Sequence, residues 1–465
     1  MDKKLKNNSV SWITKITTTF FVLICFVIYL IYAETLDKVE EFINKKEFDK
    51  ALQILEKNKQ KFALDYYLNL AYIYAYTDKD YDKILREAKQ IFVDKIQDKS
   101  TKDKNFSKIL FGYGYIHYYV KNDIYSSEIF LRKSLEYDQN NDKASITLAQ
   151  LYYDKGETDK SEELLDKTFD LLKNKNALTS DFIKIYSQVL MENRRYSKVV
   201  QILEPYIEKY DIAKLFYAKA LTFKSEYLKA NQIIKQFLNK NNDNLEAYYI
   251  LGLTYKDSRI KSTEGIEIIN SLNPEKNDRY YLKLAQFYEG LGDIELAINY
   301  YDKALAINKN NEKYYILAIT YAIDVGQTSR AINWAFEYYT KKPNDFNANL
   351  FLAMCYEGQK QFENAKKYYQ QAINIDPSRY EPYVRMAWIV LEQEADFNTS
   401  AQILLDGYQN VKDLYYKRRF KISLKQIVEL EEEFKKKYKQ KTNQDISKPI
   451  KPELKEKIMK IIKEE

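Results

Sequence analysis

Apolar residues recur along most of the chain at the spacing of amphipathic helices. Within residues 356–377, Ala365, Tyr369 and Ala372 lie at i, i+4 and i+7, so they share one face of a predicted helix. A short polar turn precedes this segment, and Pro377 ends it. Only 10 Gly and 7 Pro occur among 465 residues, so the pattern predicts many helices joined by short turns.

The same spacing occurs 68 residues earlier, which is two periods of 34 residues. There Ala297, Tyr301 and Ala304 repeat the small, large, small order. A second amphipathic stretch lies in front of each of these helices. Its apolar residues are Tyr281, Leu284, Ala285 and Tyr288 in the earlier repeat, and Leu352, Ala353 and Tyr356 in the later repeat. Each repeat is therefore predicted to be two helices that cross closely at small residues, with aromatic side chains filling the spaces between them.

These positions resemble those of the tetratricopeptide repeat (TPR), which places Leu-Gly/Ala, Tyr, Gly, Ala, Phe/Tyr, Ala and Pro at fixed intervals. Partial copies lie elsewhere, so that roughly ten or eleven repeats cover residues 34–412. The resemblance implies an all-α fold, a right-handed superhelical solenoid of helix-turn-helix repeats. One such repeat cannot bury its apolar face alone, and a stack of repeats is therefore expected.

An apolar run at residues 13–33 is predicted to be a transmembrane helix that precedes the solenoid, because its length fits a bilayer. Lysines lie before and at the start of this run, and acidic residues follow it. A cleaved signal peptide ending at Ala33 would need a small residue in place of Ile31, and a lipoprotein signal would need one before Cys25. A buried helix of a soluble protein is a poor fit to a run that is apolar on all sides. The charge asymmetry favours an uncleaved anchor, with residues 1–12 in the cytoplasm and the solenoid on the extracytoplasmic side of a bacterial cytoplasmic (inner) membrane.

The C-terminal part is predicted to close the stack. Residues 413–441 should form a helix that caps the last repeat. Its apolar stripe consists of Ile427, Leu430, Phe434 and Tyr438. Residues 442–465 follow as a Lys-rich tail with a short amphipathic helix, which is either solvated or in contact with anionic lipid or a partner. Elsewhere, the polar segment 94–108 is predicted to be an exposed insertion between repeats.

The chain lacks the sequence motifs of common enzymes and cofactor sites. No HExxH, P-loop or GxSxG sequence occurs, and the glycines Gly112 and Gly114 are too few for a dinucleotide fingerprint. The single histidine, His117, and Cys355 are interpreted as structural residues, because one histidine and no CxxC pair do not build a multi-ligand metal site. We therefore expect no catalytic residue, no cofactor and no bound metal. The balance of 74 basic against 67 acidic residues disfavours a nucleic-acid partner.

The TPR resemblance also implies a binding surface. In TPR proteins the concave wall is supplied mainly by the fifth and ninth positions of each first helix. The residues at those positions here are Tyr249, Leu253, Leu282, Gln286, Tyr315, Ile319, Leu350, Met354, Val384 and Trp388. TPR domains that grip a C-terminal carboxylate carry Lys, Asn and Arg at such places, and this mostly apolar set departs from that pattern. It is read either as a groove for a protein segment with apolar anchors, or as residues that pack against adjacent helices or the C-terminal tail.

The sequence thus predicts a membrane-anchored TPR scaffold or adaptor that binds a protein or peptide in assembly, secretion or a chaperone-like role. Two alternatives remain open. One is a self-assembling structural component of an envelope complex, which would make the chain a homo-oligomer. The other is a non-catalytic subunit of a polysaccharide or glycan export system.

Overall fold

The computed structural model describes residues 35–95, 99–256, 261–411, 414–442 and 445–463. The predicted cytoplasmic segment 1–12 and the predicted transmembrane helix 13–33 lie outside these ranges. Among the described helices, none has the length and apolar character needed to cross a bilayer. The anchor therefore stays a prediction from the sequence.

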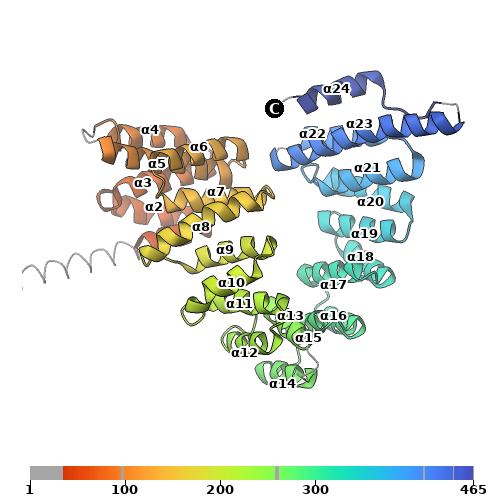
Figure 1. Ribbon diagram of the computed structural model, residues 1–465, viewed down its shortest axis with the longest axis horizontal. Helices are drawn as coiled ribbons and strands as arrows, with labels where there is room; N and C mark the ends of the chain where they lie inside the picture. Colours follow the sequence, from red (N-terminus) through yellow and green to blue (C-terminus); the bar gives the residue numbers. More distant parts are fainter. Residues whose placement is uncertain (1–34, 96–98, 257–260, 412–413, 443–444, 464–465) are drawn as a thin grey trace, which may run out of the picture. The chain divides into compact units, whose positions relative to one another are not determined.

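The described chain is helical and divides into two compact units (Figure 1). Of the described residues, those up to 154 together with 163–174 form one unit, and residues 155–162 together with those from 175 onward form the other. The first unit contains α2 (Phe48–Lys57), α3 (Lys59–Tyr76), α4 (Tyr81–Phe92), α5 (Lys99–Tyr119), α6 (Ile124–Tyr137) and α7 (Asp142–Asp154). Helix α8 (Thr158–Asn174) contributes residues to both units.

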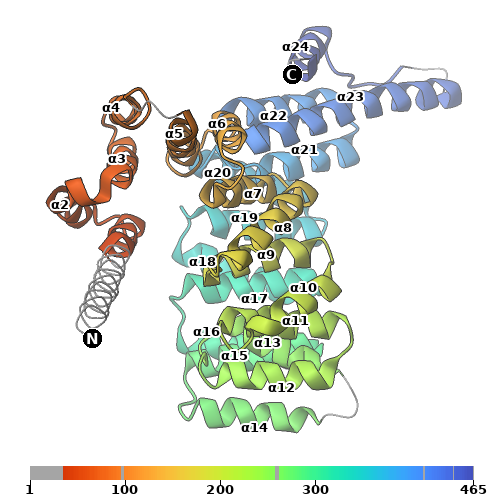
Figure 2. The same ribbon diagram turned by 60° about the vertical axis from the view of Figure 1, so that its left-hand side comes forward.

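The second unit continues the helical array to the C-terminal region. Its helices are α9 (Ser180–Glu192), α10 (Tyr196–Leu203), the 3-10 turn η1 (Glu204–Tyr206), α11 (Asp211–Phe223), α12 (Tyr227–Leu238), α13 (Leu245–Thr254), α14 (Ser262–Leu272), α15 (Asp278–Leu291), α16 (Ile294–Ile307), α17 (Glu312–Asp324), α18 (Thr328–Lys341), α19 (Phe346–Gly358), α20 (Phe362–Ile375), α21 (Glu381–Glu394), α22 (Phe397–Asn410), α23 (Leu414–Thr442) and α24 (Pro452–Lys463). Within this unit, helices α15 to α22 are stacked in chain order (Figure 2).

The small and aromatic positions predicted for the two best repeats lie in the core. Ala297, Ala304 and the equivalent alanines of α20 are fully buried, and Tyr301 and Tyr369 fill the space between them. Because the alanines have no side chain beyond Cβ, neighbouring helices pack close to α16 and α20. The predicted helix-turn-helix repeat is therefore confirmed at these positions.

A close crossing joins the first helices of two successive repeats, α13 and α15. A Cβ atom on Gly252 would lie 2.0 Å from the carbonyl oxygen of Phe287, and one on Gly290 would lie 2.0 Å from the carbonyl oxygen of Tyr249. Any larger residue would collide with the opposite backbone. These two glycines consequently set the distance between the helices that carry the predicted groove residues.

The segment predicted as an exposed insertion is partly helical instead. Helix α5 begins at Lys99, and Ser107 inside it is fully buried. The Ser107 hydroxyl donates to the carbonyl oxygen of Ser134 on α6 at 2.8 Å, and the Ser134 hydroxyl donates back to the carbonyl of Ser107 at 2.7 Å. The polar sequence suggested exposure, but Ser107 is buried because it and Ser134 satisfy their hydrogen-bonding groups with one another between α5 and α6.

Helix α23, the predicted cap, packs against α22, and its buried face differs from the predicted stripe. Phe420 and Leu424 are fully buried, and Ile427 is 1% exposed. Leu430 and Phe434, which were predicted to lie in the same buried stripe, are 38% and 39% exposed. At about 100° per residue, the observed stripe is rotated from the predicted one by only about a sixth of a turn. Both stripes therefore share Ile427, and the Phe434 ring still contacts the ring of Phe397 at 5.5 Å between centroids.

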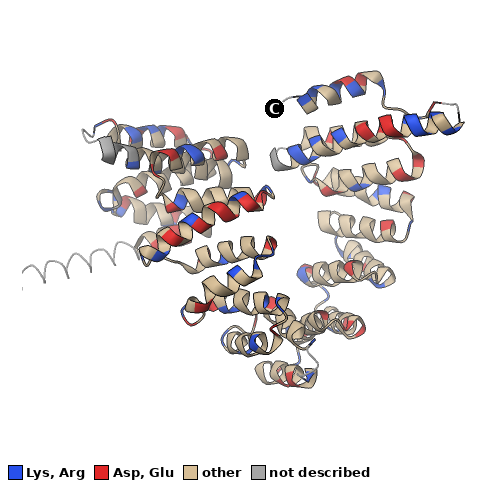
Figure 3. Cartoon of the chain, viewed as in Figure 1, with Lys and Arg blue, Asp and Glu red and all other residues tan. Residues whose placement is uncertain are grey.

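The Lys-rich tail is packed onto the cap. Ile446, Ile450, Leu454 and Ile458 join the same core cluster as the buried residues of α22 and α23. Along α23 the charges come in blocks, with acidic residues in the middle of the helix and basic residues toward both ends (Figure 3). The tail is thus a further layer of the stack, and the solvated alternative does not hold for residues 445–463.

Candidate functional site

The ten predicted groove residues lie on five first helices, α13, α15, α17, α19 and α21, with two on each. Because each pair is spaced i and i+4, both members share one helix face. Their burial differs sharply along the stack. The side chains that are half-exposed are Tyr249, Leu253, Met354, Val384 and Trp388, whereas those that are buried are Leu282, Gln286, Tyr315, Ile319 and Leu350. Whether the half-exposed set binds a partner stays a prediction.

Tyr315 is an example of a predicted groove residue that lies in the hydrophobic core instead. Its ring stacks on that of Tyr338 with centroids 5.4 Å apart and an interplanar angle of 5°. Its hydroxyl oxygen accepts a hydrogen bond from Lys341 Nζ at 2.6 Å, and it is 1% exposed. The alternative weighed from the sequence, packing against adjacent helices, therefore describes Tyr315.

Two glutamates next to this face were not singled out from the sequence. Glu289 in the last turn of α15 and Glu357 in the last turn of α19 occupy the same position of their repeats, each directly after a tyrosine and before a glycine. The signal was present, since Tyr-Glu-Gly occurs at 288–290 and again at 356–358. In both repeats the buried tyrosine of the second helix donates its hydroxyl hydrogen to this glutamate, Tyr301 to Glu289 and Tyr369 to Glu357.

The electrostatic setting of Glu289 favours its protonated form more than usual. Burial raises the pKa of this carboxyl, and the nearby negative charge of Asp324 adds to the rise. Hydrogen bonds from Tyr301 at 2.8 Å and from Gln286 Nε2 at 2.9 Å act in the opposite direction. Both of these donors bind the same oxygen, Oε2. Burial together with the charge of Glu289 also raises the pKa of Tyr321 to about 12.

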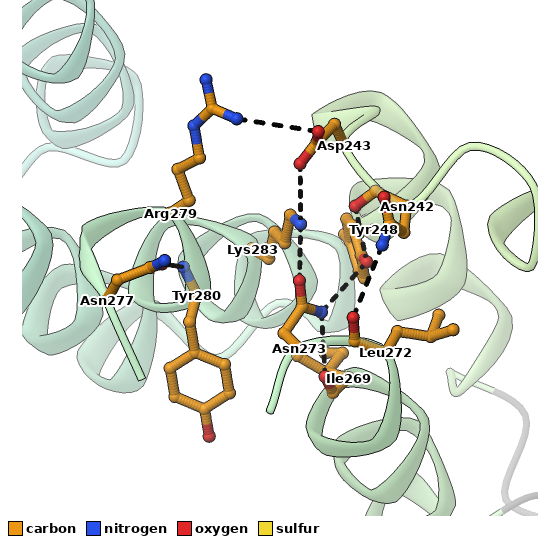
Figure 4. A network of polar contacts seen from close by, with 10 residues as sticks. All are labelled: Asn242, Asp243, Tyr248, Ile269, Leu272, Asn273, Asn277, Arg279, Tyr280 and Lys283. Carbon is orange, nitrogen blue, oxygen red and sulfur yellow. Dashed lines mark hydrogen bonds and ion pairs between the residues drawn. The ribbon is translucent and has the colours of Figure 1, made fainter. Parts of the chain in front are cut away.

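A second polar cluster fastens α13, α14 and α15 together (Figure 4). The ammonium group of Lys283 lies 3.1 Å from Asp243 Oδ1 and donates to Asn273 Oδ1 at 2.5 Å. Asn273 in turn donates to the hydroxyl of Tyr248 at 3.3 Å, and Lys283 Nζ lies 5.5 Å from the centroid of that tyrosine ring. Each polar group has a partner inside the cluster, so this arrangement stabilises the repeat junction.

A cavity of about 470 Å³ opens between α20, α21 and α22. Gln370, Asn374, Tyr383, Asp406 and Asn410 are among its lining residues. Tyr383 donates to the carbonyl oxygen of Pro377 at 3.2 Å and accepts from Asn410 Nδ2 at 3.1 Å. The tyrosine hydroxyl is thus engaged by the fold itself.

The two residues interpreted as structural lie as expected. Cys355 is fully buried, and burial raises the pKa of its thiol to about 12. His117 lies at the end of α5, with Nδ1 3.2 Å from Asp123 Oδ2 and its ring edge-on to Tyr81. Over the described part of the chain, no group of three His, Cys, Asp or Glu side chains is placed to hold a metal ion.

Comparison with known proteins supports the repeat. A model of the tetratricopeptide repeat matches residues 278–311 and 346–379, which are the helix pairs α15–α16 and α19–α20. A TPR repeat-containing protein of Methanocaldococcus jannaschii is 24% identical in an alignment of length 387 that covers 76% of this chain and 66% of that protein. The chain therefore spans a little less than two thirds of that relative's length.

Several solved structures are also similar. The human IFIT1 dimer with m7Gppp-AAAA is 16% identical, covers 82% of this chain and 88% of its own, and has a TM-score of 0.37. PilW, a type IV pilus biogenesis factor, is 14% identical over 45% of this chain and 97% of its own, with a TM-score of 0.33. MamA from Desulfovibrio magneticus RS-1 is 14% identical over 45% of this chain and 94% of its own, with a TM-score of 0.27. At these scores, nothing about partners or function of this chain follows from them.

Proposed function

We propose that this chain, two segments of which are tetratricopeptide repeats, is a non-catalytic scaffold that binds a protein segment along the first helices of its C-terminal repeats. TPR stacks expose extended concave surfaces that suit this work. The observation that supports it most is the half-exposure of Tyr249, Leu253, Met354, Val384 and Trp388 at equivalent positions of α13, α19 and α21. Tyr, Trp and Met are enriched in the cores of protein interfaces, and an apolar side chain left partly open is available to a partner.

The scaffold is further proposed to be held at the extracytoplasmic face of a bacterial cytoplasmic membrane by residues 13–33. This part rests on the sequence, namely the apolar run with lysines before it and acidic residues after it. Protease added to intact spheroplasts should then digest the repeats while residues 1–12 stay protected. Protection of the repeats under the same conditions would overturn the orientation, and release of the intact chain into the periplasm would overturn the anchor.

Photo-crosslinking in cells tests the binding role. A benzoyl-phenylalanine at Trp388 should capture a discrete partner. The same probe at Phe336 serves as the matched control, because this residue of α18 is an exposed aromatic outside the predicted groove positions. Equal capture at both positions, or none at Trp388, would count against a groove on the first helices.

A further inference from the structure

The two well-matched repeats contain the same glutamate, but among the described residues only the later one, Glu357, is paired with a cation. In the later repeat, Glu357 Oε2 accepts from the hydroxyl of Tyr369, and Arg385 Nη1 lies 3.2 Å from Oε2 and 3.3 Å from Oε1. Arg385 belongs to α21, the first helix of the following repeat. The fold thus supplies its own guanidinium to this carboxylate.

In the earlier repeat the guanidinium is missing. The residue that corresponds to Arg385 is Ile316 of α17, because each lies two residues before the buried alanine of its helix, Ala387 and Ala318 respectively. Glu289 Oε2 is engaged by Tyr301 and Gln286. Within the described ranges, Glu289 Oε1 has no hydrogen-bond partner and Glu289 forms no ion pair. The place that Arg385 fills in one repeat is therefore left without a cation in the other.

The surroundings of Glu289 favour a cation further. Asp324 ends α17 one turn after Tyr321, whose ring lies 5.8 Å from that of Tyr301, and it acts on Glu289 as a like charge. Tyr249, one of the half-exposed groove residues, crosses next to Glu289, because a Cβ on the adjacent Gly290 would lie 2.0 Å from the carbonyl oxygen of Tyr249. The charge of Glu289 also adds to the rise that burial causes in the pKa of Tyr249. Two carboxylates and an aromatic ring without an internal cation form a surface that attracts a guanidinium, which binds carboxylates in a planar, two-pronged manner and stacks on rings.

We propose that Glu289, with Asp324 and Tyr249 beside it, binds an arginine side chain of the partner segment. This inference rests on the proposed function and specifies its partner: the segment carries an arginine in register with its apolar anchors. Arg385 acts as an internal example of the ligand, because it shows which group the equivalent carboxylate accepts. Apolar side chains of the same segment would lie over Leu253 and the ring of Tyr249.

Binding of defined peptides to the full chain in detergent micelles tests this directly. Three pools of acetylated, amidated nonapeptides would carry arginine, citrulline or glutamate at the centre, with Ala, Leu, Tyr, Ser and Gln mixed elsewhere. Citrulline has the shape of arginine without its charge. Fluorescence anisotropy should show the arginine pool binding about ten- to hundredfold more tightly than the citrulline pool, as expected for a hydrogen bond between charged groups.

Three variants locate the effect. Glu289→Gln should remove the preference for arginine, whereas Glu357→Gln, the matched change in the later repeat, should keep it even where it lowers the melting temperature. Ile316→Arg should place a guanidinium of the chain itself opposite Glu289. It should therefore block the arginine pool while the protein remains folded by circular dichroism.

The outcomes separate this inference from the proposed function. Equal binding of the arginine and citrulline pools, or an unchanged preference in Glu289→Gln, would overturn the arginine site while leaving a groove that binds apolar segments. Absence of binding by all three pools would also overturn it, and capture at Trp388 in cells would then decide the proposed function independently.

Discussion

The fully buried carboxylate of Glu431 accepts a hydrogen bond from the backbone N–H of Ile450 at 2.6 Å. This bond joins the cap helix α23 to the segment that leads into α24. Lys455 Nζ lies 3.0 Å from Glu431 Oε2, and Lys435 Nζ lies 3.1 Å from Oε1. A carboxylate that is removed from water needs such partners, and here two of the three come from the tail.

Replacing Glu431 by Ala should release the tail. The change leaves the N–H of Ile450 and the ammonium of Lys455 without their acceptor, and breaking a buried ion pair typically costs about 3–5 kcal/mol. Limited proteolysis should then cut residues 445–463 early, and the melting temperature should fall. Glu433→Ala is the control, because Glu433 is exposed and, in the part of the chain that the structure describes, its ion pair is with Lys437 of the same helix. If both variants are cut at the wild-type rate, Glu431 does not hold the tail.

The cap should depend on Phe420 far more than on Phe434. Phe420 is fully buried, with its ring 4.7 Å from that of Tyr380 and 5.9 Å from that of Tyr383. Phe420→Ala should therefore cost about 3–5 kcal/mol, as buried phenylalanines do, and Phe434→Ala clearly less. Urea denaturation followed by circular dichroism measures both. Equal losses of unfolding free energy in the two variants would show that Phe434 is as much a part of the buried face as Phe420, as the sequence predicted.

Gly252→Ala should separate α13 from α15. A Cβ at this position meets the carbonyl oxygen of Phe287, a backbone atom that moves only with its helix. Overpacking of this kind costs about 1–3 kcal/mol and sometimes more. Gly358→Ala is the matched control, because its Cβ would meet only the side chain of Thr328 at 3.2 Å. We expect a lower melting temperature for Gly252→Ala alone, and equal values would show that the crossing adjusts freely.

The stabilising effect of Glu162 should disappear in acid. Burial alone would raise the pKa of this carboxyl, but hydrogen bonds from Lys198 and Asn193 and the charges of Lys198 and Arg195 lower it below the ordinary value of 4.5. A depressed carboxyl pKa contributes stability that is present above the unfolded pKa and is lost as the pH falls through the folded pKa. At pH 7, the free energy of unfolding of Glu162→Gln should thus be about 1–3 kcal/mol lower than that of the wild type, and its melting temperature should be lower as well. A difference that stays constant well below pH 4 would contradict the assignment.

The sequence was sufficient to predict the helix pairs where one repeat has the same residue pattern as another. Ala297, Tyr301 and Ala304 keep the spacing of their later counterparts, and that periodicity alone identifies a helix pair that needs neighbours. The face of α23 was misjudged because it has no second copy to set its phase, and Ile427 fits both the predicted and the observed stripe. Glu431 was missed for a different reason: a buried carboxylate is recognisable only once its partners on the tail are known.

The groove was predicted only in outline, because the fifth and ninth positions of a helix do not say how closely the next helix packs. Tyr315 and Val384 both occupy the fifth position of their repeats, and Ile319 and Trp388 both occupy the ninth. Tyr315 and Ile319 are nevertheless buried, Tyr315 against Tyr338, whereas Val384 and Trp388 are half-exposed. The paired Tyr-Glu-Gly segments carried more information than the apolar positions, since they mark a carboxylate whose partner differs between repeats. That difference depends on Ile316 and Arg385, which lie in the following repeat.

Tyr315 and Trp388 should therefore respond to alanine substitution in opposite ways. Tyr315→Ala removes a buried ring and the acceptor of Lys341. It should lower the free energy of unfolding by about 3–5 kcal/mol, as is typical of a lost core aromatic, and the melting temperature with it. Trp388→Ala removes a half-exposed ring, so circular dichroism and melting temperature should stay near wild type while peptide binding and crosslinking are lost. Interface tryptophans often cost 2 kcal/mol or more when truncated, about thirtyfold in affinity. A Trp388→Ala protein that binds as wild type does, or that loses binding only in proportion to unfolding, would place the partner surface elsewhere.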